Sequence, residues 1–136
     1  MSGPDRRQQV PGIAAEEFAE TGLHGASTET IARRAEITQA HIFRMSGTKK
    51  ALFLEVVVSA FDRMAEGMSQ AACTKTGREA LTRMGAQYNE MLAGRTSLLL
   101  QLQGFAACGD PRFATPCAAA SGGCGRRSPR PSGSTR

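Results

Sequence analysis

The chain has 136 residues, of which 40% are hydrophobic and none is Trp, and its formal net charge is +5. That length suits one domain, or one small domain and part of a second, with a modest core. The N-terminus MSGPDRR lacks the apolar stretch of a secretory signal, and the longest apolar run, ALFLEVVVSAF, is broken by Glu55 and too short to cross a bilayer. We therefore expect a cytoplasmic protein that has no contact with the membrane.

The positive charge lies in the last segment of the chain. Residues 1–50 carry seven Lys/Arg and six Asp/Glu, residues 51–110 carry five and six, and residues 111–136 carry five and none. The overall charge therefore says nothing about the first 110 residues. A nucleic-acid function must be argued from where the charges of that part are placed.

Catalytic and metal sites are not indicated. The four cysteines form no CxxC pair and have no His close to them, as a zinc site would require; they are Cys73, Cys108, Cys117 and Cys124. We interpret them as buried or incidental thiols of a reducing compartment. The chain also shows no nucleophile–base pair and no phosphate loop, so we expect no cofactor and no enzyme activity.

The first residues, 1–9, resemble a flexible polar arm. Helical periodicity then begins at Val10, with Ile13, Ala14 and Phe18 near helical spacing. Because Pro suits the first turn of a helix and not its interior, we expect a short first helix that begins near Pro11. Gly22, within TGLHG, is the expected end of this helix.

Two short helices should follow, joined by a tight turn. Ser27 or Thr28 can cap the first, TETIARRA, which is followed by the connection Glu36-Ile37. Thr38 should cap the next helix, residues 39–45, with Ile42 and Phe43 facing inward and Gly47 at its end.

Three longer helices complete the pattern. Thr48 should cap a long fourth helix with an apolar stripe of Phe53, Val57, Phe61, Met64 and Met68. After a turn at 74–77, a fifth helix should present Leu81, Met84, Tyr88 and Met91, and a sixth should run through LLLQLQGFAAC to about Cys108. Because no segment alternates with a period of two for long enough to be a strand, the predicted fold class is all-α.

The composition changes after Phe113. Residues 114–136 contain little besides Ala, Gly, Ser, Pro and Arg, which cannot bury a core, so we expect a disordered tail. A shift of reading frame is the alternative, because one base restored after the Phe113 codon allows a back-translated sequence of helical periodicity. In that case the chain would be a truncated form.

The two short helices and their turn make a helix-turn-helix motif, whose second helix can enter the major groove of DNA. If Ile42 and Phe43 anchor that helix, Gln39, His41 and Arg44 point outward. Gln can pair with adenine and Arg with guanine. The following Thr48-Lys49-Lys50 begins a helix with free N–H groups and two ammonium groups, which is suited to holding phosphates.

These segments resemble the tetracycline-repressor (TetR) family. The matching stretches are FAETGLHGAST, TIARRAEIT and AHIFRMSGTKKALF, within residues 10–54, with a looser similarity up to LLLQLQGFAACGDP. The resemblance implies a homodimeric regulator with a three-helix DNA-binding head, residues 10–54, and a helical body for inducer binding and dimerisation, of which residues 55–113 would be an incomplete part. It places Thr28 and Lys49 at phosphate-contacting positions. The positions that it directs to the groove are Thr38, Gln39, Ala40, His41 and Arg44.

Three residues depart from the family pattern. Pro11 stands where an aliphatic residue is usual, and Glu36 replaces a turn glycine, so a residue with a Cβ should adopt an unfavourable φ. Ser46 occupies a normally aromatic position, and losing such a ring costs about 3–5 kcal/mol where the site cannot collapse.

The leading interpretation is a DNA-binding transcriptional regulator, a repressor that binds a palindromic operator in double-stranded DNA as a homodimer and is released by a small-molecule inducer. The alternative is a truncated helical fragment that neither dimerises nor binds a specific operator. For single residues, an interpretation without a specific role in binding also stays open. Gln39 and Arg44 could belong to a solvated helix face, His41 could neighbour phosphate or solvent, and the methionines could be core rather than ligand pocket.

Overall fold

A computed structural model describes residues 3–111 of the chain, and those residues form six α-helices and no strand, as the all-α prediction requires. The helices are α1 (Gly3–Gly25), α2 (Thr28–Arg34), α3 (Gln39–Ser46), α4 (Lys49–Ala72), α5 (Gly77–Ala93) and α6 (Arg95–Ala107). The expected tail at 114–136 and two of the cysteines, Cys117 and Cys124, lie outside the described residues. Within that part of the chain, Cys73 and Cys108 are free thiols.

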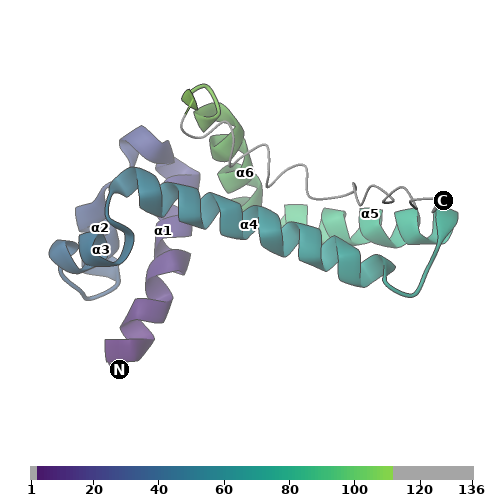
Figure 1. Ribbon diagram of the computed structural model, residues 1–136, viewed down its shortest axis with the longest axis horizontal. Helices are drawn as coiled ribbons and strands as arrows, with labels where there is room; N and C mark the ends of the chain where they lie inside the picture. The colour runs from purple at the N-terminus through teal and green to yellow at the C-terminus, as the bar shows by residue number, and fades with distance from the viewer. Residues whose placement is uncertain (1–2, 112–136) are drawn as a thin grey trace, which may run out of the picture.

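Helix α4 is the axis of the molecule (Figure 1). Helices α2 and α3 gather at its N-terminal end, whereas α5 packs along its C-terminal half. Helix α6 then returns to pack on both α1 and α4. The structure therefore has a small three-helix head, α1 to α3, and a helical extension that reaches back to it.

The predicted start of the first helix is wrong. Helix α1 begins at Gly3, so that Pro11 lies in its interior and residues 3–9 are helical rather than a flexible arm. The reason is burial: Val10 is only 2% exposed and continues the stripe of Ala14 and Phe18 one turn further toward the N-terminus. The free energy gained by burying that turn exceeds the cost of the backbone hydrogen bond that Pro11 cannot donate.

The predicted break near the end of α1 is present. Gly22 has φ 72° and ψ 179°, values outside the helical region, and the helical turn resumes up to Gly25. Glycine adopts a positive φ without steric cost, which explains why the chain can change direction there.

The core lies where α1, α4 and α6 meet. The rings of Phe18 and Phe53 pack edge to face with centroids 5.2 Å apart, and those of Phe61 and Phe105 do so at 5.5 Å. Of the predicted stripe on α4, Phe53, Val57 and Phe61 are buried, and the two methionines, Met64 and Met68, are partly buried.

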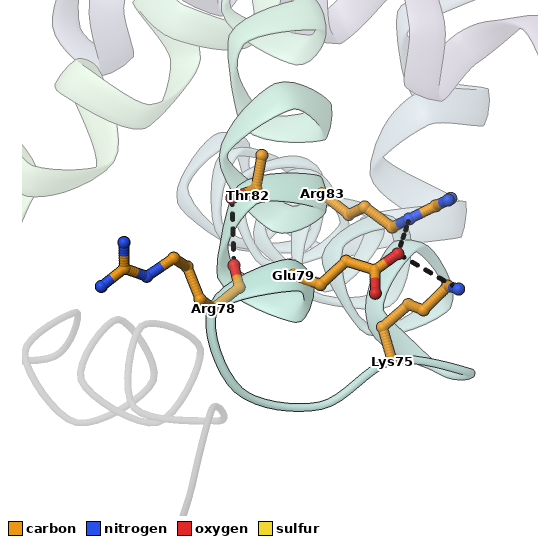
Figure 2. Close-up of polar contacts among 5 residues, drawn as sticks. All are labelled: Lys75, Arg78, Glu79, Thr82 and Arg83. Carbon is orange, nitrogen blue, oxygen red and sulfur yellow. Dashed lines mark hydrogen bonds and ion pairs between the residues drawn. The ribbon is translucent and has the colours of Figure 1, made fainter.

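Helix α5 does not bury the predicted stripe. None of its residues is buried, and Leu81 is 69% exposed. Helix α5 packs mainly on α4, with fewer contacts to α6, and these contacts do not cover its apolar face. The first turns are held instead by surface contacts (Figure 2): Glu79 pairs with Lys75 at 3.1 Å and with Arg83 at 3.8 Å, and the Thr82 hydroxyl donates to the Arg78 carbonyl oxygen.

Candidate nucleic-acid interface

The α2–turn–α3 unit forms one end of the molecule (Figure 1). Its turn is closed by backbone hydrogen bonds from Glu36 N to Arg33 O at 3.2 Å and from Ile37 N to Ala32 O at 3.0 Å. Glu36 has φ 53°, the positive value expected for a residue that replaces a turn glycine. Its carboxylate pairs with Arg6 at 3.6 Å, so the extended α1 contacts the turn. The unit thus has helix-turn-helix geometry despite a strained residue at its centre.

Both short helices and α4 begin at side-chain caps. Of the two alternatives for α2, Ser27 is the cap, with its Oγ accepting from Thr30 N at 3.3 Å. Thr38 caps α3 by accepting from His41 N at 3.3 Å, and Thr48 caps α4 by accepting from Ala51 N at 3.0 Å. Gly47, with φ 80°, ends α3 as predicted. The caps fix where α3 starts and how α4 leaves it.

Helix α3 has one buried anchor rather than two. Ile42 is 1% exposed, but Phe43 is 40% exposed, so the expectation that Phe43 faces inward is wrong. Successive residues of a helix lie about 100° apart, and a helix of only two turns that rests on Ile42 leaves its neighbour at the edge of the contact. Met45 is 45% exposed on the same helix. The exposed face of α3 therefore includes two apolar side chains that the sequence prediction did not place there.

The candidate base-reading residues differ in their accessibility. Ala40 and Arg44 are exposed, and the guanidinium of Arg44 makes no hydrogen bond or ion pair within residues 3–111. His41 is half-buried, and its Nε2 is enclosed without a hydrogen-bond partner in the described part of the chain. The side chain of Arg44 is therefore accessible, while His41 is turned partly into the protein.

Thr28 and Gln39 are joined to each other. The Gln39 Nε2 donates to Thr28 Oγ1 at 2.6 Å, and Thr28 is only 8% exposed. The hydrogen bond ties the first turn of α2 to the first turn of α3. Gln39 is itself exposed, so its amide can leave this bond for adenine, but only at the cost of breaking it.

The two lysines of the expected phosphate clamp have partners within the protein. Lys49 Nζ donates to the backbone oxygens of Ala26 at 3.2 Å and His24 at 3.5 Å, where it stabilises the C-terminal end of α1. Lys50 Nζ pairs with Asp110 Oδ2 at 3.5 Å, with the two side chains 42% and 32% exposed. An ion pair this exposed is weak.

The arrangement as a whole suits a DNA surface. The N-terminal turn of α2, the exposed face of α3 and the first turn of α4 lie at one end of the molecule (Figure 1). Among residues 3–111, no three side chains of the metal-ligating types lie close enough to hold an ion. None of the helices that the structure describes combines the length and the hydropathy needed to span a membrane.

Comparison with known proteins agrees with this geometry. Residues 13–56 match the sequence model of the family described as bacterial regulatory proteins, tetR family. A search of curated proteins found no match. A solved structure, described as a TetR-like transcriptional regulator from Rhodococcus sp. RHA1, superposes with a TM-score of 0.65 at 22% sequence identity, over 91% of this chain and 73% of the other.

The segment matched by the family model contains α2, α3 and the first turns of α4, with most of α1. Members of the family are DNA-binding regulators rather than enzymes, and the superposition independently supports the same helical fold. Residues 13–56 therefore match the N-terminal DNA-binding domain of the tetR family, which supports a role in the regulation of transcription.

Proposed function

We propose that the chain is a cytoplasmic repressor that binds a palindromic operator as a homodimer and is released by a small molecule bound by its helical body. The observation that carries the proposal is the exposed face of α3, where Ala40 and Arg44 lie beside the cationic first turn of α4. In a helix-turn-helix dimer, two such faces lie one turn of DNA apart and read symmetric half-sites.

The individual roles follow from the contacts. Arg44 would bind guanine, and Gln39 would bind adenine after exchanging its hydrogen bond with Thr28. Ala40 would allow the close approach of α3 to the base edges. Lys50 would exchange Asp110 for a phosphate.

The remaining residues would set the position of these groups. Thr38 and Thr48 hold the starts of α3 and α4 through their caps, and their exposed backbone turns would approach the phosphates. Lys49, bonded to the end of α1, would hold the head and add positive charge near the DNA backbone. His41, half-buried, would contact the sugar–phosphate edge rather than a base.

The test is selection of a preferred duplex from a random pool with the full chain, followed by fluorescence anisotropy at several salt concentrations. A specific site should bind about 10³-fold or more tightly than a scrambled duplex, and affinity should fall steeply with salt. Equal affinity for the two duplexes would reject specific operator binding. A reporter gene placed behind the selected site then distinguishes repression, expected here, from activation.

A non-dimerising helical fragment is the second candidate, because the outer helices leave apolar side chains uncovered. Leu81 is 69% exposed, and Leu102 and Phe105 are each 55% exposed. Exposed apolar surface of this kind favours non-specific association. Light scattering separates the two readings: the proposed repressor gives a dimer that is independent of concentration, and the fragment gives a monomer or growing aggregates.

A further inference from the structure

A concave pocket lies where the head meets the helical extension, and Arg44 is not among its lining residues. It has a volume of about 440 Å³ and is lined by residues of α1, α4, the end of α5 and the first turns of α6. That volume is within the range of small-molecule sites, which run from roughly 300 to 1,000 Å³. The pocket is therefore large enough for a small ligand.

The floor of the pocket is apolar. Ala15 of α1, Ala60 of α4 and Leu100 of α6 line it and are 8%, 3% and 1% exposed. Met91, at the end of α5, adds a thioether to the same wall. A hydrocarbon chain or ring would be removed from water against these side chains, which is favourable.

The rim of the pocket carries polar groups that the protein does not use. Arg63 of α4 lines it together with Thr96 and Ser97 in the first turn of α6. Within residues 3–111, the side chains of these three residues make no hydrogen bond or ion pair. Glu16, the acidic residue of the lining, is paired with Arg34. The rim thus offers one uncompensated cation and two hydroxyl groups.

We propose that this pocket binds a small amphipathic carboxylate, with Arg63 holding the carboxylate and Thr96 and Ser97 donating hydrogen bonds to it. A planar guanidinium matches a carboxylate in a two-point contact, and the apolar floor takes the rest of the ligand. A neutral ligand would leave the charge of Arg63 unmatched. Helix α1 lines the pocket and also packs on α2, so a bound ligand would change the position of the head relative to α4. The regulatory role of such a change rests on the proposed function.

The binding test uses octanoate and its neutral counterpart octanamide, titrated calorimetrically into the full chain without DNA. We expect one saturable site that prefers octanoate by about tenfold, a difference of about 1.4 kcal/mol, because only the carboxylate matches the charge of Arg63. Arg63→Gln should abolish the preference. The matched control is Arg78→Gln, which makes the same charge change on an exposed side chain of α5 that points away from the Glu79 contacts and does not line the pocket (Figure 2).

Three results would overturn the proposal: no saturable binding, equal binding of octanoate and octanamide, or an undiminished preference in Arg63→Gln. A second variant, Ser97→Phe, fills the pocket from a half-buried position and should reduce the binding of both compounds. Since no DNA is present, failure here is separate from failure of operator binding, which is measured with duplexes alone.

Discussion

Replacing Gly104 by alanine would test how closely α4 and α6 pack. A Cβ built on Gly104 lies 2.7 Å from Val57 Cγ1 and 3.5 Å from Phe61 Cε2. Favourable carbon–carbon contacts begin at about 3.5 Å, so the added methyl group requires a neighbour to move. Val57 is 1% exposed and β-branched, and Phe61 is packed against Phe105, so neither side chain has an easy alternative position.

Two effects oppose each other in this variant. Alanine stabilises a helix interior by about 0.8–1.0 kcal/mol relative to glycine. Overpacking a core costs about 1–3 kcal/mol, and the stiff surroundings of Gly104 favour the upper part of that range. We therefore expect Gly104→Ala to lower the free energy of unfolding by about 1–2 kcal/mol, equivalent to a fall in Tm of roughly 4–8 °C.

The matched control is Gly85→Ala in α5, where a Cβ would meet no atom within 4 Å. Only the helix preference acts there, so Tm should rise by roughly 4 °C. Thermal unfolding followed by circular dichroism measures both variants. If Gly104→Ala unfolds at or above the temperature of the unmodified protein, the close approach of α4 and α6 is wrong. Adding Val57→Ala to Gly104→Ala should cost less than the sum of the two single changes, since the two side chains share the contact.

Substitutions at four further positions test the head. Glu36→Gly should raise Tm by roughly 2–4 °C, because relief of the positive φ contributes about 1–2 kcal/mol and exceeds the cost of glycine's added unfolded-state entropy. The control Glu36→Gln removes only the exposed ion pair with Arg6 and should change Tm little. Identical Tm values for the two variants would contradict backbone strain at Glu36. Lys49→Ala should lower the free energy of unfolding by about 1–2 kcal/mol, because the hydrogen bonds of Lys49 to the end of α1 are lost. It should weaken binding to all duplexes alike, with the slope of log K against log [salt] reduced by about one. A changed sequence preference would show that Lys49 reads bases. Arg44→Ala should leave Tm unchanged and reduce discrimination at one base pair by about 1–3 kcal/mol, measured with duplexes altered at single positions; uniform weakening would make Arg44 a phosphate contact. Ser46→Phe should raise Tm, because a ring at position 46 would pack on Phe43 one helical turn away. The hydrogen bond from Ser46 to Glu55 that is lost is long, at 3.4 Å, and exposed. A lower Tm would mean that the site has no room for the ring.

Local features of the head could be predicted from the sequence alone. A cap joins residues only three positions apart, so Thr38 and Thr48 identify the starts of α3 and α4 without knowledge of the fold. Gly47, at the end of α3, and Glu36, in a turn that requires a positive φ, are equally local. These positions, together with the apolar spacing of α4, are sufficient to predict the helix-turn-helix motif and the all-α fold class.

Contacts between distant residues were decided only by the tertiary structure. The burial of Val10 extends α1 through Pro11 against the local preference of proline, and the small contact area of α3 leaves Phe43 outside. Lys49 bonds to carbonyl oxygens that precede it by more than twenty residues, and the pocket at Arg63 exists only because α1, α4 and α6 converge. Spacing along the chain determines which residues share a helix face. Which face is covered, and by what, depends on the packing of elements that are far apart in the sequence.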